Sequence, residues 1–232
     1  MKKKFRQILL TVAAFPLIAA ANTANAQAIE SVFGLDVSNP RAFVAALATL
    51  DQSNPTGGQT VTVWANVYDG SSPATHTVVV GYDTLEEREA AVTQRNASKG
   101  WVDFQQTLVG VSDLVNTSMA VEAFREGSGW AGHGALSATL MTVTDPAEYA
   151  GAFSRLVDRL DNPGSIRLMQ MPFGGEGVTH VVLFSAPDSA VLTTFLTEMT
   201  ASKVYQDFVD DVEDIRTIQT VNLYRRVVTF GD

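Results

Sequence analysis

One stretch of this chain occurs twice, and this repeat limits the folds that the sequence can adopt. Residues 75–104 and 179–208 align without a gap at a constant offset of 104 positions. Nine of the thirty positions are identical, where roughly two identities would be expected by chance for ordinary composition. In the first copy the identical residues are Thr75, His76, Val78, Thr93, Ala97, Ser98, Lys99, Asp103 and Phe104. We therefore interpret the chain as two copies of one structural unit.

Both copies show the same order of predicted elements, which is strand, helix, strand, strand, helix, strand. Alternating apolar residues indicate the strands, and helices are predicted where Asn39, Thr84, Asp145 and Asp188 can act as N-caps. The predicted strands are residues 29–37, 60–68, 76–81 and 115–124 in the first copy, and residues 136–143, 166–173, 180–185 and 216–228 in the second.

This order of elements is that of the ferredoxin-like split βαβ unit, in which both helices cover one face of a four-stranded sheet. The other face then needs a cover, because an exposed apolar sheet face is unstable in water. A second copy can supply the cover by packing sheet against sheet. We therefore predict an α+β fold in which two ferredoxin-like repeats share one core.

The second helix of each copy carries a further pattern, a small residue followed by two aromatic residues after a break in the helix. The pattern spans Ser98–Phe104 and Ser202–Phe208. Together with the βαββαβ order it resembles the dimeric α+β barrel superfamily, which includes antibiotic biosynthesis monooxygenases and NIPSNAP-like proteins. The resemblance implies that the two repeats form the whole barrel within one chain. Members of this superfamily include cofactor-free oxygenases, haem enzymes and isomerases, and their catalytic residues vary, so the resemblance implies no catalytic residue here.

The first 26 residues have the pattern of a signal peptide rather than of a folded segment. A lysine-rich start precedes an apolar run, and Ala24-Asn25-Ala26 fits the rule for cleavage between small residues. The apolar run is shorter than the roughly 20 residues of a spanning helix. We expect an exported protein, periplasmic or secreted, with repeat 1 at residues 27–126, a glycine-rich linker at 127–134 and repeat 2 at 135–232.

Composition excludes several classes of partner and site. Removal of Lys2, Lys3, Lys4 and Arg6 with the signal peptide leaves 12 basic and 25 acidic residues, a net charge of −13. Such a chain repels phosphate backbones and anionic lipid, so we expect neither nucleic acid nor membrane as a partner after cleavage. The absence of cysteine excludes disulfides and thiolate metal sites. We expect no metal site.

The second strand of each copy supplies the candidate ligand-binding residues. The predicted strand in the first copy alternates, so Trp64, Asn66 and Tyr68 should point away from the helices. At the offset of 104, Leu168 and Gln170 correspond to Trp64 and Asn66. Aromatic rings and amides on an inner face can hold and orient a small molecule, although the amides could equally bind neighbouring backbone. We predict that these five residues line a site between the sheets.

The histidines and one arginine are further candidates. His76 and His180 start the third strand of each copy, and they could shuttle protons at a cavity mouth or bind backbone at a strand end. His133 lies in the linker, where we expect it to be exposed. Arg167 could hold a carboxylate, although a solvated sheet edge is the commoner setting.

Three functions remain open on this evidence. The chain could bind a small apolar or aromatic molecule between the sheets, it could be a cofactor-independent monooxygenase-like enzyme, or it could be a structural protein whose barrel is filled by side chains. No motif requires a cofactor, while haem stays open through the superfamily. A cavity of a few hundred cubic ångströms would favour the first two functions. The barrel is expected to be monomeric or to associate further.

The signal peptide leads to the first prediction. The protein recovered from outside the cytoplasm should begin at Gln27 or within one residue of it, because cleavage is expected after Ala26. Mass spectrometry of the N-terminal peptide measures this directly. Recovery of intact Met1 in the soluble extracytoplasmic fraction would contradict it.

Overall fold

The computed structural model describes residues 27–53, 59–70, 72–127 and 132–231. The predicted signal peptide lies outside the described residues, as does the middle of the predicted linker. The first copy contains seven elements in its described part. They are β1 (Ile29–Val37), α1 (Pro40–Ser53), β2 (Val61–Tyr68), β3 (His76–Tyr82), α2 (Leu85–Ala97), α3 (Lys99–Leu108) and β4 (Ser112–Gly127).

The second copy repeats this order, so the predicted arrangement of elements is confirmed. Strands β4 and β8 are longer than predicted. The elements of the second copy are β5 (Ala135–Val143), α4 (Pro146–Val157), β6 (Ser165–Phe173), β7 (His180–Ala186), α5 (Ser189–Ala201), α6 (Lys203–Val212) and β8 (Arg216–Phe230).

Side-chain caps set where the helices begin, at the same places in both copies. Thr84 accepts a hydrogen bond from the Glu87 N–H at the start of α2, at 3.1 Å. Ser98 accepts from the Trp101 N–H at 3.1 Å and so starts α3 after a one-residue break. Ser202 does the same for α6. These bonds satisfy backbone donors that the first turn of a helix leaves free.

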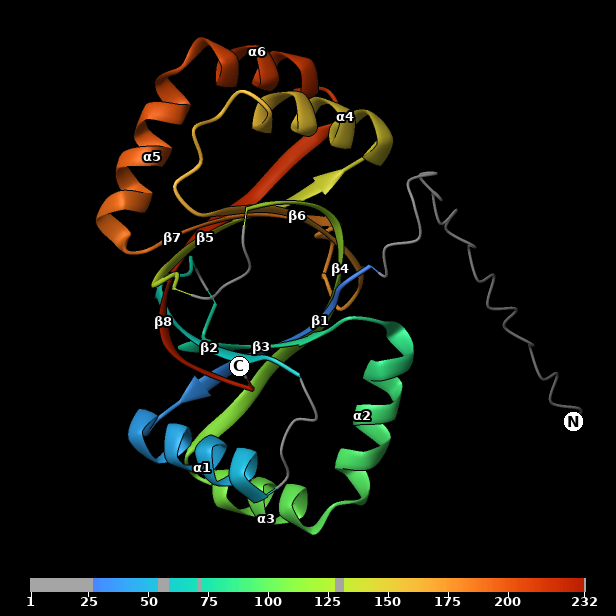
Figure 1. Ribbon diagram of the computed structural model, residues 1–232, viewed down its shortest axis with the longest axis vertical. Coiled ribbons are helices and arrows are strands. Elements are labelled where there is room, and N and C mark those ends of the chain that lie inside the picture. Colours follow the sequence, from blue (N-terminus) through green and yellow to red (C-terminus); the bar gives the residue numbers. More distant parts are fainter. Residues whose placement is uncertain (1–26, 54–58, 71, 128–131, 232) are drawn as a thin grey trace, which may run out of the picture.

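The eight strands form one closed, antiparallel barrel in the order β1-β3-β2-β8-β5-β7-β6-β4. Figure 1 looks down this barrel, with α1 to α3 on one side and α4 to α6 on the other. The copies meet at two seams, where β2 pairs with β8 and β4 pairs with β6. Each seam joins strands from different copies, so neither copy closes the barrel alone.

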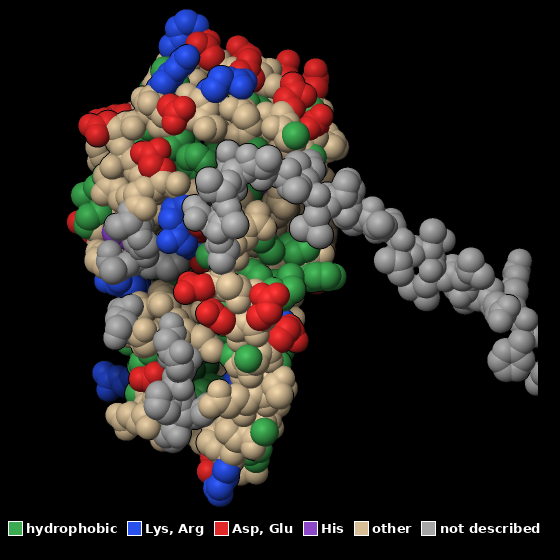
Figure 2. Space-filling view, turned by 45° about the vertical axis from the view of Figure 1, so that its right-hand side comes forward, with side chains coloured by type: hydrophobic (Ala, Val, Ile, Leu, Met, Phe, Trp, Pro, Cys, Tyr) green, Lys and Arg blue, Asp and Glu red, His purple; other side chains and the backbone are tan. Residues whose placement is uncertain are grey.

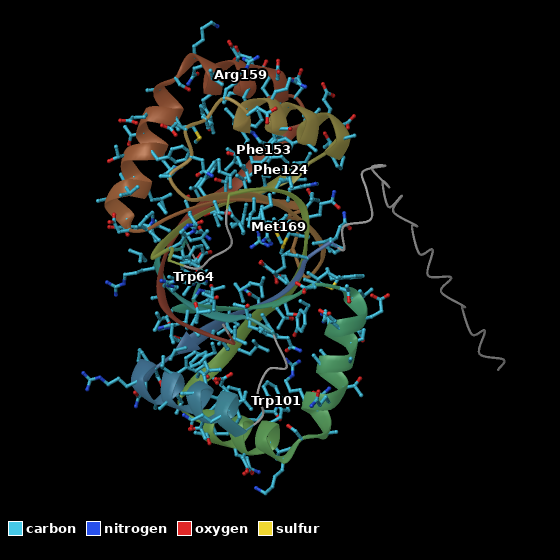
Figure 3. All side chains as sticks on the ribbon, viewed as in Figure 1. Trp64, Trp101, Phe124, Phe153, Arg159 and Met169 are labelled. Atoms are coloured by element: carbon cyan, nitrogen blue, oxygen red, sulfur yellow. The ribbon has the colours of Figure 1, made fainter. Side chains whose placement is uncertain are left out.

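Three separate cores follow from this arrangement. One lies between the helices and strands of the first copy, around Phe43 and Phe104, and a second lies in the equivalent place around Phe153. The third lies inside the barrel and includes Trp64 and Met169. Figure 3 shows Trp64 and Met169 within the ring of strands, whereas Phe153 lies on the helix side. The inner faces of the two sheets are thus covered by each other, as the sequence predicts.

The strand order also places the two hairpins of the copies at one end of the barrel. Equivalent strands, such as β1 and β5, lie opposite each other in the ring and run in the same direction, because neighbours alternate. The copies are therefore related by a rotation about the barrel axis. Residues 69–70 and 72–75, between β2 and β3, and residues 174–179, between β6 and β7, consequently lie at the same end.

The outer surface carries the negative charge that the composition implies. Figure 2 shows acidic side chains on the helix layer at the top and again near the middle of the visible face. No helix in the described part of the chain is both long and apolar enough to cross a membrane.

The shared core leads to the second prediction. Residues 135–232 expressed alone should aggregate or form a homodimer, because β6, β8 and the inner sheet face lose their partners at both seams. Analytical ultracentrifugation of this half, beside residues 27–232, checks the outcome. A stable, soluble monomer of the half would show that the seams are not needed for folding.

Candidate functional site

The interior of the barrel contains a cavity of about 700 Å³. Residues of both hairpins line it, so it reaches the end of the barrel where the hairpins lie. Its apolar wall includes Trp64, Val79, Leu136, Met169, Val181 and Leu183. The ring of Trp64 is fully buried and gives this wall its largest flat surface. A cavity of this size can hold a small organic molecule.

A hydrogen-bonded polar cluster joins the copies at the seam between β2 and β8. Asp69 accepts from Asn66 Nδ2 at 2.6 Å and from Asn222 Nδ2 at 2.5 Å, through different carboxylate oxygens. Asn222 Nδ2 also donates to the Tyr224 hydroxyl oxygen at 3.0 Å. Asp69, Asn222 and Tyr224 line the cavity, and Asn222 and Tyr224 are buried. The cluster thus presents a carboxylate and a phenol to the interior.

Two threonines fix the amides of this cluster. Thr77 Oγ1 donates to Asn66 Oδ1 at 3.0 Å, and Thr220 Oγ1 donates to Asn222 Oδ1 at 2.8 Å. Each amide therefore has its oxygen held by a hydroxyl and its nitrogen directed at Asp69. Such a network is rigid, because a side chain that moves breaks hydrogen bonds to its neighbours.

The protein environment shifts the ionisation of both acidic groups in the cluster. Burial raises the pKa of Asp69, while hydrogen bonds from Asn66 and Ser72 partly oppose this. Burial raises the pKa of Tyr224 to about 12; the hydrogen bond with Asn222 opposes this rise and the charge of Asp69 adds to it. Tyr224 is therefore a neutral phenol at physiological pH, and Asp69 is the member of the cluster that has a carboxyl group.

The predicted site residues from the first copy have different positions. Trp64 lines the cavity as predicted. Asn66 lies behind the lining residues Asp69 and Thr77 and holds them by hydrogen bonds. Tyr68 is 72% exposed and does not line the cavity. The reason is a register shift against β8 between Asn66 and Tyr68, which ends the strict alternation on which the prediction depended.

Leu168 and Gln170 lie on the outer side of β6 and not in the cavity, which corrects their predicted orientation. Val78 and Val182 are equivalent at the offset of 104, and they pair with Val63 and Leu168. Leu168 is therefore the counterpart of Val63, at an offset of 105, and both pack toward helices. A slip of one residue turns every side chain of a strand to the opposite face.

The true counterpart of Trp64 is Met169, which lines the opposite wall of the cavity. Asn66 corresponds in the same way to Met171, since their N–H groups donate to the carbonyls of the equivalent residues Thr75 and Thr179. The hairpin of the first copy is thus one residue longer than that of the second. The gapless alignment at an offset of 104 holds from residue 75 onward. Its extension back into β2 was wrong, because β2 and β6 correspond at an offset of 105.

His76 and His180 face the helices rather than the cavity. The His76 ring lies 6.2 Å from that of Phe43 on α1, and the His180 ring lies 6.3 Å from that of Tyr149 on α4. Both are buried, and Nδ1 of each lies within 3.0 Å of the hydroxyl of the preceding threonine. Burial lowers the pKa of His76, and it lowers that of His180 to about 4. This setting is that of neutral rings packed in the helix-side cores.

His133 and Arg167 differ from their predicted surroundings. His133 is buried, and its Nδ1 lies 2.8 Å from the Ser185 hydroxyl, because the end of the linker folds over β7. Arg167 is also buried, inside the barrel, where it pairs with Glu30 and Glu122 at 2.6 Å each. Neither is the solvent-exposed group that its position in the sequence suggested.

Sequence reasoning missed Asp69, Asn222 and Tyr224. Asp69 belongs to an Asp-Gly pair that indicates a turn, and nothing local shows that this turn faces a cavity. Asn222 and Tyr224 are two residues apart on a predicted strand, so their common face could have been found by the same alternation that identified Trp64. The contact of Asn222 with Asp69, 153 positions away, depends on the seam between the copies.

The described residues include no group of three or more His, Asp or Glu side chains that could hold a metal ion.

No protein-family model matches the sequence. No curated protein matches it significantly either.

Solved structures do resemble the fold. A candidate monooxygenase from Fusobacterium nucleatum has a TM-score of 0.62 at 11% identity, covering 88% of this chain and 94% of that one. An anthrone oxidase-like protein has a TM-score of 0.60 at 12% identity, covering 89% and 93%. A haem-binding protein from Thermus thermophilus has a TM-score of 0.51 at 9% identity, covering 87% and 92%. At these identities the likeness shows the fold alone: two ferredoxin-like halves of one polypeptide form a single α+β barrel.

Proposed function

We propose that this protein binds a small apolar or aromatic molecule inside its barrel. A cavity of about 700 Å³ in the described part of the barrel supports binding over a purely structural role, for which a filled barrel was expected. Apolar side chains on both walls provide the burial that drives binding, and Trp64 offers a flat surface for a ring. The barrel closes within one chain, so this site needs no second copy of the protein.

The observation that carries this proposal is the difference between the two seams. The rotation that relates the copies places equivalent residues at both seams, yet only the seam of β2 and β8 has the polar cluster. At the equivalent positions the opposite seam has small or apolar residues, and its own buried ion pairs, those of Arg167 with Glu30 and Glu122, lie at other positions along the strands. The four strand residues of the site region have small or apolar counterparts in the other copy: Met169 for Trp64, Met171 for Asn66, Ser118 for Asn222 and Ala120 for Tyr224.

A cofactor-independent oxygenase-like enzyme is the second candidate. The half-buried carboxylate of Asp69 lines the cavity and has a raised pKa, which suits a general base. Two proteins of similar fold, the candidate monooxygenase and the anthrone oxidase-like protein, bear names of this kind. Such an enzyme would use the same cavity, so the binding proposal covers both cases.

Haem fits the cavity poorly. Met169, Met171 and Tyr224 are the lining residues of a type that ligates haem iron, and the Tyr224 hydroxyl is already bonded to Asn222. None of the described lining residues is a histidine or a basic side chain that could pair with the haem propionates. His76 and His180 pack toward the helices. We therefore assign haem no role in this cavity, although a haem-binding protein shares the fold.

The proposed function includes export of the protein from the cytoplasm. The basic start, the apolar run and Ala24-Asn25-Ala26 support it, and it stays a prediction, since residues 1–26 lie outside the described residues.

Filling the cavity leads to the third prediction. Ala138 is buried and lines the cavity, so Ala138→Phe should place a ring in the space that the ligand needs. Compounds found by screening small aromatic molecules against the wild type should lose at least about tenfold in affinity. Calorimetry measures the affinity, and the thermal midpoint should stay within a few degrees of the wild type.

Ala90→Phe is the matched control, because Ala90 is exposed on α2 and is not one of the lining residues. It should bind as the wild type does. Equal affinity of Ala138→Phe and wild type would place the ligand outside the barrel.

Haem titration provides the fourth prediction. The purified chain should form no stoichiometric haem complex, because the lining offers neither a histidine ligand nor a cation for the propionates. Absorbance in the Soret region during titration is the measurement. One haem bound per chain, with the complex lost in Tyr224→Phe or Met169→Ala, would contradict the assignment.

A further inference from the structure

The charged side chains among the described residues that line the cavity are all acidic. Glu30, Asp69 and Glu176 line it, and none of the described lining residues is lysine, arginine or histidine. Glu30 is neutralised by Arg167 at 2.6 Å, a residue that is itself not part of the lining. Glu176 is exposed on the hairpin between β6 and β7 and is screened by water. Asp69 is therefore the carboxylate whose charge acts inside the cavity.

Asp69 has hydrogen bonds but no counter-charge. Its oxygens accept from the neutral amides of Asn66 and Asn222. The ion pairs among the described residues include other acids and not Asp69. The chain as a whole is acidic and supplies no compensating field. A half-buried carboxylate without a cation costs free energy, and a bound cation would recover it.

Aromatic rings lie on the same part of the wall. Tyr224 is linked to Asp69 through Asn222. Trp64 lines the cavity from β2, the strand that also carries Asn66 of the cluster. Aromatic rings attract cations through their negatively charged faces, and they also pack against flat ligands. A carboxylate and aromatic rings in one apolar cavity are the groups that recognise an amine attached to a ring.

We infer that the cavity selects an aromatic molecule that carries a protonated amine, with Asp69 as its counter-charge. The inference rests on the proposed function and narrows it to a class of ligand. The same charges reject anionic ligands, because a carboxylate or phosphate in the cavity would meet Asp69 and find no basic partner among the described lining residues.

Three probes of similar size test the inference. They are 1-naphthylmethylamine, 1-naphthylmethanol and 1-naphthoic acid, which are cationic, neutral and anionic at pH 7. Calorimetry on the wild type should give the amine at least about tenfold higher affinity than the alcohol, because hydrogen bonds to a charged group are worth more than neutral ones. The acid should bind more weakly than the alcohol.

Asp69→Asn tests the residue itself. This substitution removes the charge of the side chain and keeps its shape. The preference for the amine over the alcohol should therefore fall to about threefold or less. The affinity for the alcohol should stay within about twofold of the wild-type value. Asp103→Asn is the matched control, since Asp103 is exposed on α3, pairs with Lys99 and changes the net charge equally. It should retain the wild-type preference.

The outcomes separate the two proposals. Binding of the alcohol without preference for the amine in the wild type would overturn the inference and leave the proposed function standing, and so would an acid that binds as well as the amine. An unchanged preference in Asp69→Asn would remove Asp69 from the assignment. Failure of all three probes, together with failure of the wider aromatic screen, would overturn both. The wild-type comparison holds even if Asp69→Asn does not fold.

Discussion

The structure depends on the pairing of strands from different copies at the two seams of the barrel. A βαββαβ unit covers one face of its sheet with helices and leaves the other face apolar. The pairs β2–β8 and β4–β6 close the ring, and each inner face then covers the other. Without these pairs each copy would expose both edge strands and an apolar face. The buried residues of each helix-side core come from one copy, with a few side chains such as Phe124 or Val228 added across a seam, whereas the core inside the barrel draws on both copies throughout.

Closure also creates the site. Asp69 belongs to the first copy and Asn222 to the second, and their hydrogen bond of 2.5 Å crosses a seam. The opposite seam is held differently, by the buried pairs of Arg167 with Glu30 and Glu122. A buried ion cluster of this kind fixes which groups lie together but adds little net stability. One seam thus has carboxylates that are paired with a buried arginine, and the other presents the carboxylate of Asp69 to the cavity without a salt bridge among the described residues.

The fold could be predicted from the sequence because its signals are local or repeated. Caps such as Thr84 and Ser98, strand alternation and the offset of 104 gave the elements, and their order gave the barrel. The site was harder, since it depends on which face a strand presents. The hairpin after β2 has one residue more than its counterpart, so Trp64 corresponds to Met169 and not to the predicted Leu168. A register shift near Tyr68 exposes the ring of that residue. The contact between Asp69 and Asn222 has no local signal at all.

The presence of both halves in one chain has an evolutionary consequence. In a barrel built from two identical chains, one substitution changes both seams, so a polar group introduced at one wall also appears at the other. Here each wall has its own codons, and one wall has Ser118 and Ala120 where the other has Asn222 and Tyr224. Duplication followed by fusion therefore allows one wall to specialise while the other preserves the packing of the ancestral barrel. The ratio expected for such a protein is one ligand per chain, in place of two symmetric half-sites.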